Sequence, residues 1–143
     1  MKQKLALAGP VLTMILLSAC STTPDIPTAA LPALEKGDHL VSHTGDKLFV
    51  YKKDAAGQSH CVRDCLKVFR PMFSTPDDKA SGHFATIDRP DGMSQWTYKG
   101  APLYVCPVPT VAKDAPAKLV QAAARKAEAC AKAAGGDWVA ARP

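Results

Sequence analysis

Residues 89–104 read Arg-Pro-Asp-Gly-Met-Ser-Gln-Trp-Thr-Tyr-Lys-Gly-Ala-Pro-Leu-Tyr, and this stretch decides the fold. Its Pro-Asp-Gly turn separates residues 83–87 from residues 94–98, and both runs are rich in aromatic and β-branched side chains. Two such runs around a turn predict an antiparallel hairpin. A further turn at residues 99–102 leads into Leu103-Tyr104-Val105. Short strands separated by turn signals predict a small antiparallel sheet.

An internal repeat links this stretch to an earlier one. Residues 45–51 and 100–106 share a glycine, a leucine followed by an aromatic residue, and a valine at matched positions. One strand unit therefore occurs twice. Within the first copy, Leu48 and Val50 alternate with Phe49 and Tyr51, so the two pairs are expected on opposite faces of the sheet.

Two helices are expected outside the sheet. The segment from Asp114 to Ala134 is rich in Ala, Lys and Glu, begins with Asp114 as N-cap and Pro116 in the first turn, and ends before Gly135-Gly136. Apolar positions at spacings of three and four predict a core-facing stripe of Val120, Ala123, Ala127, Cys130 and Ala134. A short cysteine-containing helix is expected over residues 61–69. The sequence thus predicts a single α+β domain.

The N-terminus has the layout of a bacterial signal peptide. Lys2 and Lys4 precede an apolar run over residues 5–17. This run is too short for a membrane-spanning helix, which needs roughly 20 apolar residues. The following Leu-Ser-Ala-Cys sequence resembles the lipobox of bacterial lipoproteins, which implies cleavage after residue 19 and a lipid on Cys20.

The expected mature chain is a lipid-anchored tether followed by one domain. Residues 20–36 contain three prolines and no apolar periodicity, which predicts a semi-extended tether, and residues 37–143 form the domain. Ser21 follows the lipid-bearing cysteine where lipoproteins retained at the inner membrane of Gram-negative bacteria typically carry Asp. The resemblance therefore implies an outer-membrane anchor, with a domain that faces the periplasm or the cell surface.

The expected partners are the membrane, through the lipid, and an envelope protein. The formal net charge is +5, and Lys and Arg are scattered along the chain rather than clustered. A nucleic-acid partner would need a basic stripe with stacking aromatic side chains. The sequence therefore does not indicate nucleic-acid binding.

Four cysteines remain beyond Cys20, and an even number in an exported domain predicts two disulfides with three possible pairings. The spacing of Cys61 and Cys65 puts both thiols on one side of a helical turn. Cys130 lies on the predicted core stripe, and Cys106 at the end of a strand is the partner outside the local pair. We therefore favour Cys61–Cys65 and Cys106–Cys130.

The local cysteine pair also fits a soft-metal site. Two thiolates on one turn, with His60 or His83 nearby, would suit Cu(I), and a labile, redox-active bridge is a related alternative. The chain lacks the alternating strands and helices of thioredoxin-like copper-delivery proteins, which favours a plain disulfide of Cys61 and Cys65. No cofactor is expected in the leading interpretation, and copper is the alternative.

The chain also resembles a family of predicted bacterial lipoproteins with a repeated Tyr-x-(Phe/Trp/Tyr)-x-x-Asp motif, a secreted repeat of unknown function. Residues 49–54 correspond to the first copy of the motif, with Phe49 in place of the leading Tyr, and the most specific family stretch is present in full over residues 89–104. The likeness covers residues 45–143 and departs in the second copy, where Cys106 stands in the aromatic position. The matching positions are Phe49, Tyr51, Asp54, Arg89, Asp91, Gly92, Gln95, Trp96, Tyr98, Gly100, Pro102, Leu103 and Tyr104.

The motif side chains have structural interpretations as well as functional ones. Asp91-Gly92 is expected to form a turn, with Asp54 and Arg89 satisfying backbone groups near it. The aromatic residues are expected to form a small sheet core rather than a ligand groove, and they are Phe49, Tyr51, Trp96, Tyr98, Tyr104 and Trp138.

No catalytic residues follow from the resemblance. Ser59-His60 could suggest a hydrolase, but the chain has no Gly-x-Ser-x-Gly stretch, and sequence neighbours rarely form a triad. The leading hypothesis is a non-enzymatic envelope lipoprotein that binds another envelope component or contributes to surface structure. Copper or redox handling through Cys61 and Cys65 is the alternative, and an enzyme with a site along residues 89–95 is a third hypothesis.

Overall fold

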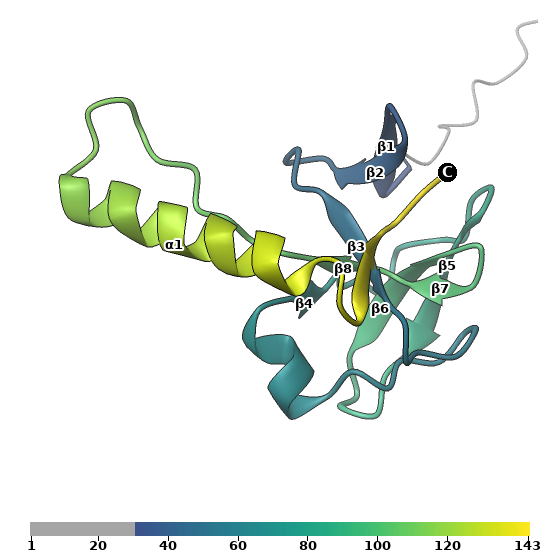
Figure 1. The fold of residues 1–143 in the computed structure, drawn as a ribbon. Helices are drawn as coiled ribbons and strands as arrows, with labels where there is room; N and C mark the ends of the chain where they lie inside the picture. The colour runs from purple at the N-terminus through teal and green to yellow at the C-terminus, as the bar shows by residue number, and fades with distance from the viewer. Residues whose placement is uncertain (1–30) are drawn as a thin grey trace, which may run out of the picture.

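The computed structural model describes residues 31–143, so the predicted signal peptide, Cys20 and most of the tether lie outside the described residues. Antiparallel sheets and one long helix make up the described part, as Figure 1 shows, and the expected α+β class is confirmed. In chain order the elements are β1 (Ala33–Lys36), β2 (His39–Ser42), β3 (Leu48–Tyr51), the 3-10 helix η1 (Arg63–Lys67), β4 (Arg70–Pro71), β5 (Phe84–Asp88), β6 (Ser94–Tyr98), β7 (Ala101–Pro102), β8 (Tyr104–Val105), α1 (Ala117–Ala133) and β9 (Trp138–Ala140).

The two copies of the repeated strand pair with each other at the centre of a four-stranded sheet ordered β4-β8-β3-β9. Leu48 lies opposite Val105, and Phe49 lies opposite Tyr104. Leu48 and Phe49 are both buried but belong to different hydrophobic clusters, as the alternation of side chains along a strand requires. The sheet therefore has a buried core on each face, and the prediction that the two residue pairs of β3 lie on opposite faces is confirmed.

A pseudo-two-fold axis through the Phe49–Tyr104 pair relates the two copies. Exchanging the copies maps Phe49 onto Tyr104 and leaves the register of their ladder unchanged. The matched glycines agree as well, because Gly45 and Gly100 have φ values of 85° and 82°. A residue with a Cβ adopts such left-handed conformations only with strain, so both turns require glycine.

The symmetry extends to the outer strands of this sheet. We call residues 45–71, with β3, η1 and β4, the first unit, and residues 100–140, with β8, α1 and β9, the second unit. The pairing of β4 with β8 and of β9 with β3 puts Phe69 and Trp138 at matched positions of the two units. Their rings stack with centroids 4.1 Å apart and 20° between their planes. β4 pairs with β8 and β9 pairs with β3, so every ladder of the sheet joins one unit to the other. The two units are interlocked.

The predicted hairpin between the units is confirmed. β5 and β6 pair with Ile87 opposite Gln95. At the turn, the Gly92 amide donates a hydrogen bond to the Arg89 carbonyl at 3.0 Å, and Gly92 has a φ of 79°. β7 then pairs with β6, and β8 follows in the four-stranded sheet. The hairpin is therefore fixed directly beside the repeated strands.

The hairpin of β1 and β2 corrects the predicted end of the tether. The tether is predicted to reach residue 36, but residues 33–36 form β1, with Ala33 opposite Ser42 of β2. Ala33 is buried in the same cluster as Leu40 and Leu48. The other three residues of β1 are exposed, so this strand has little apolar pattern to reveal it.

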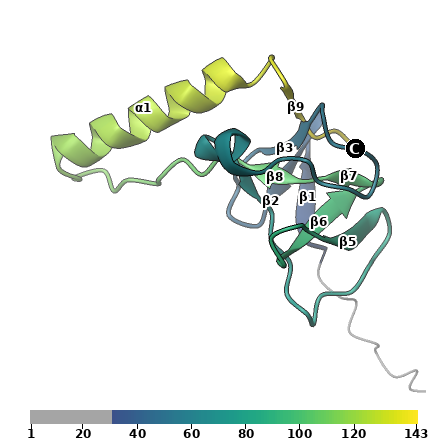
Figure 2. The ribbon, with the colours of Figure 1, turned by 90° about the horizontal axis from the view of Figure 1, so that it is seen from below.

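Helix α1 projects away from the sheets, as Figures 1 and 2 both show. It begins at Ala117, with Pro116 at the cap position and no side-chain cap, so the prediction of Asp114 as N-cap is wrong. Proline at this position already fixes a φ suited to the entry of a helix. Within the described residues no helix is both long and apolar enough to cross a bilayer.

Only part of the predicted core-facing stripe of α1 is buried. Ala123 and Cys130 are buried, whereas Ala127 is exposed and Val120 is 44% exposed. The reason is length, because α1 extends past the edge of the sheets and its first turns lie beyond them (Figure 1). Periodicity identified the correct face of the helix but could not show how far the body of the domain reaches.

Both predicted disulfides are present, with Cα–Cα distances of 5.6 Å for Cys61–Cys65 and 6.0 Å for Cys106–Cys130. The helix predicted over residues 61–69 is shorter, because η1 covers only Arg63–Lys67. Arg63 has a φ of 57°, so the chain changes direction there and Cys61 lies before the helix.

Candidate functional site

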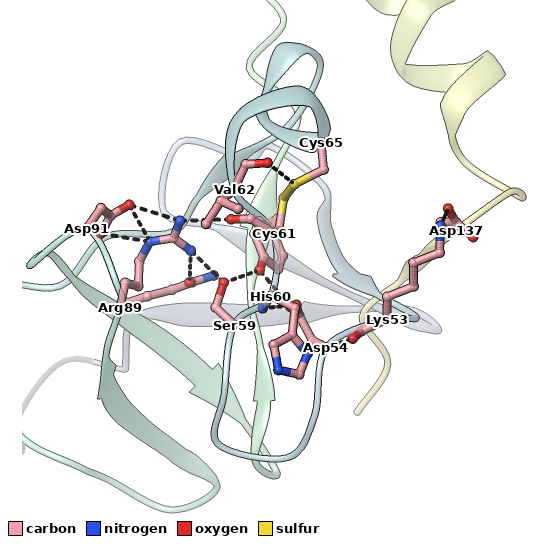
Figure 3. The surroundings of a disulfide bond; sticks show 12 residues. Lys53, Asp54, Ser59, His60, Cys61, Val62, Cys65, Arg89, Asp91 and Asp137 are labelled. Atoms are coloured by element: carbon pink, nitrogen blue, oxygen red, sulfur yellow. Dashed lines mark hydrogen bonds and ion pairs between the residues drawn. A yellow bond between two sulfur atoms is a disulfide. The ribbon is translucent and has the colours of Figure 1, made fainter.

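The polar side chains of the family-like motif gather beside the Cys61–Cys65 disulfide, as Figure 3 shows. Arg89 follows β5 at the hairpin turn, and its side chain is fully buried. It reaches from the hairpin to the segment between β3 and β4, which supplies the Ser59 hydroxyl and the Cys61 carbonyl. The motif therefore joins the hairpin to the first unit.

Arg89 donates hydrogen bonds through four of its five N–H groups, and its Nη2 also forms an ion pair with Asp91. Nε donates to Asp91 Oδ2 at 3.0 Å, and Nη2 contacts the same oxygen at 3.0 Å and donates to the Cys61 carbonyl at 3.0 Å. Nη1 donates to Ser59 Oγ and to Gln95 Oε1, both at 2.7 Å. A guanidinium is stable when buried only if its charge is compensated and its donors are satisfied. Here Asp91 compensates the charge, and each of the three guanidinium nitrogens donates at least one hydrogen bond.

A directional chain of hydroxyl groups continues from Arg89 to a carboxylate. Ser59 Oγ accepts from Arg89, and Tyr104 Oη donates to Asp54 Oδ2 at 2.6 Å. The 2.8 Å bond between the two hydroxyls must therefore run from Ser59 to Tyr104. Asp54 Oδ1 also accepts the His60 amide at 2.6 Å. The cation at one end and the anion at the other fix the direction of every proton between them.

The pKa of Tyr104 is raised to about 12. Burial is the main cause, and the hydrogen bond to the Asp54 carboxylate adds to it because that bond requires the protonated phenol. Tyr104 therefore keeps its proton at neutral pH and remains a donor in the chain of hydroxyls.

Ser59 and His60 do not form a nucleophile and base. Ser59 is buried, and its proton is directed to Tyr104. The His60 ring is exposed, and its Nδ1 lies 2.9 Å from the Lys53 carbonyl, an arrangement that places the proton on Nδ1. The two side chains therefore have separate partners, and the arrangement expected of a hydrolase is not formed by them.

The four residues of the copper alternative are not brought together. Cys61 and Cys65 are joined to each other, and in this form they offer no thiolate to a metal. His83 packs edge-on against Tyr98 of the hairpin, with ring centroids 5.7 Å apart. Across residues 31–143 no group of three or more His, Cys, Asp or Glu side chains is placed to hold a metal ion.

The aromatic residues lie in two clusters, one on each face of the central sheet. Trp138 is in contact with three other rings of its cluster, namely Tyr51, Phe69 and Tyr104. Phe69 in this cluster and Phe84 in the other are buried aromatic residues that the sequence analysis did not assign to the core. The sequence repeat does not reveal Phe69, because its correspondence to Trp138 follows from the pairing of β4 with β8 and of β9 with β3.

Comparisons with known proteins found no match among protein-family models, curated proteins or solved structures. The resemblance to the secreted-repeat lipoproteins therefore stays a prediction that depends on the residues quoted above.

Proposed function

We propose that this protein is a lipid-anchored component of the bacterial cell envelope with a non-enzymatic role, either in binding another envelope component or in surface structure. Its anchor is a lipid on Cys20, and its domain faces the periplasm or the cell surface. In this proposal it is similar to the secreted-repeat lipoproteins whose motif it resembles.

One observation carries the proposal, and it is the internal use of the motif's polar side chains. Arg89, Ser59 and Tyr104 direct their donors to one another and to groups of the same domain. A catalytic acid, base or nucleophile must reach a substrate atom within hydrogen-bond distance. Groups buried in a satisfied network instead hold two parts of a domain together. The functional role then belongs to the surface of the domain.

The two disulfides support an exported location. Disulfides form and persist in oxidising compartments such as the periplasm and the cell surface, and they are rare in the cytosol. Both cysteine pairs of the described domain are closed. This pairing agrees with a domain that folds after export.

Intact mass spectrometry of the full chain, expressed in a Gram-negative bacterium, tests the proposal. We expect the protein in the membrane fraction, beginning at Cys20 and carrying a diacylglyceryl group and an acylated amine, because two or more acyl chains anchor a protein stably. The Cys20→Ala variant is the control and should carry no lipid mass. A wild-type product without lipid would overturn the anchor.

Thiol alkylation of the same sample separates the proposal from copper handling. The proposal expects no alkylated cysteine before reduction and no copper adduct when Cu(I) is added. Free alkylation of Cys61 and Cys65, with one copper ion bound per chain, would instead establish a metal-handling lipoprotein.

A further inference from the structure

A cavity of about 480 Å³ lies between the four-stranded sheet and helix α1, away from the Arg89 network. Its charged lining residues are Asp46, Arg70 and Lys126, and its apolar wall is the run Pro107-Val108-Pro109. The volume falls within the range of roughly 300–1,000 Å³ that is typical of small-molecule sites. The cavity is therefore large enough for a ligand rather than for water alone.

The Cys106–Cys130 disulfide fixes the walls of this cavity. Cys106 directly precedes the apolar run, and Lys126 lies one helical turn before Cys130. Arg70 belongs to β4, which pairs with β8 at Val105. Three separate segments thus converge on the cavity, and a covalent bond holds two of them in place.

Two cations meet here, and neither is paired with Asp46, the one carboxylate of the lining. Within residues 31–143 neither Arg70 nor Lys126 forms an ion pair. Burial, with the positive charge of Arg70 as the second cause, lowers the pKa of Lys126. Lys126 Nζ donates to the Val68 carbonyl at 2.7 Å, which leaves two of its three N–H donors for another partner. An anion between the two cations would relieve their repulsion.

We propose that this cavity binds a phosphate group that carries an apolar substituent. The phosphate lies between Arg70 and Lys126, since a guanidinium and an ammonium together supply strong charge-assisted donors to phosphate oxygens. The substituent lies against Pro107, Val108 and Pro109. A soluble phosphate ester and a lipid phosphate both have this chemistry. The inference does not depend on the proposed envelope role.

Nuclear magnetic resonance titration of the purified protein, with both disulfides formed, tests the site with phenyl phosphate and with inorganic phosphate. We expect saturable shifts at the amides of Val108 and Lys126, and at least threefold weaker binding of inorganic phosphate, which has no apolar part. Arg70→Gln and Lys126→Gln should each weaken phenyl phosphate binding about tenfold, the equivalent of one lost interaction of about 1.4 kcal/mol.

Two further variants guard against a trivial loss of binding. Lys132→Gln removes an exposed positive charge of α1 that is outside the cavity, and it should change the affinity less than twofold. Asp46→Asn removes the one negative charge of the lining and should strengthen binding, a gain that misfolding cannot imitate. Equal weakening by Lys132→Gln and Lys126→Gln, or no saturable shift with phenyl phosphate, would overturn the proposal.

Vesicles of phosphatidylglycerol distinguish the two sources of the phosphate. If the proposal holds and the vesicles compete with phenyl phosphate, and do so less well with Lys126→Gln than with Lys132→Gln, the site takes a lipid phosphate. If phenyl phosphate binds and the vesicles do not compete, the site takes a soluble ester. If phenyl phosphate does not bind, and Lys126→Gln leaves vesicle binding unchanged, the result contradicts the proposed site.

Discussion

The two repeat units have matching strands, but the segments that connect these strands are stabilised by different interactions. In the first unit, the segment from β3 to β4 is held by the buried network around Arg89. In the second, the segment from β8 to β9 includes α1 and is held by the Cys106–Cys130 disulfide, with α1 projecting from the body (Figure 1). The interlocked strands and their stacked Phe69 and Trp138 are common to both. The comparison teaches that the strands define this fold and that the connecting segments can vary.

The largest effect is expected from Arg89→Met, which removes every donor of the buried guanidinium at once. The Ser59, Gln95 and Cys61 oxygens lose their partner in a buried place, and loss of one member of a buried ionic network costs about 3–5 kcal/mol. Urea unfolding should show this decrease in the free energy of unfolding. The same change at exposed Arg125 of α1 should cost less than about 0.5 kcal/mol. Similar losses for both would contradict the comparison.

Removal of the Cys106–Cys130 disulfide, which holds the second unit, should have the next largest effect. Replacing Cys106 and Cys130 by alanine should lower the free energy of unfolding by about 2–4 kcal/mol, because this disulfide closes a long loop. Hydrogen exchange should then accelerate in α1 more than in β5 and β6. The matched variant without Cys61 and Cys65 loses a bridge of sequence separation 4 rather than 24, so its loss should be smaller. The reverse order would show that the polar network alone does not hold the first unit.

Tyr104→Phe sharpens the comparison through pH. At pH 7 it should cost about 1–3 kcal/mol, since it removes the hydroxyl between Ser59 and Asp54. In the wild-type chain the pKa of this phenol is near 10 when the chain is unfolded, and folding raises that pKa to about 12. This contribution to stability is therefore complete below pH 10 and is lost as the pH rises above it, by about 3 kcal/mol at most.

Urea unfolding at pH 8 and pH 11.5 measures this difference. Wild type should lose more stability between the two values than Tyr104→Phe does. Tyr98→Phe, which changes a tyrosine outside the network, is the control and should follow wild type. Equal alkaline losses in wild type and Tyr104→Phe would mean that the network does not protect the phenol.

The smallest effect is expected at the exposed start of α1. Val120→Gln should change the free energy of unfolding by less than about 0.5 kcal/mol, because the side chain is 44% exposed and lies beyond the sheets. The change Ala123→Gln, at a buried position of the same face, is the contrast and should cost more. Thermal unfolding of both variants measures the difference, and a large loss at Val120 would indicate a partner on that surface.

Local patterns in the sequence predicted the hairpin, the repeat and the disulfides. A Pro-Asp-Gly turn between two short runs specifies β5 and β6 without reference to the rest of the chain. The spacing of Cys61 and Cys65 and the helical face of Cys130 likewise depend on neighbouring residues only. These features are present in the structure because each is stabilised by contacts near in sequence or by a period that a short segment defines.

Features that depend on distant partners were harder to predict. β1 has a single buried residue, Ala33, so its strand is set by pairing with β2 rather than by its own pattern. Arg89 was expected to satisfy backbone groups, and it does so at the Cys61 carbonyl, but most of its partners are side chains. That network joins residues up to fifty positions apart, such as Asp54 and Tyr104, and no local period marks such a set.

The interlocked sheet has a consequence for how such a domain could arise and persist. β3 and β4 of one unit never pair with each other, so a chain with only one unit would complete its sheet only on meeting a second molecule. Two identical copies related by a two-fold axis form that kind of association, which depends on concentration. Joining both copies in one polypeptide makes the encounter intramolecular. The sheet of this protein is therefore independent of protein concentration, whereas the sheet formed by two separate copies would dissociate at low concentration.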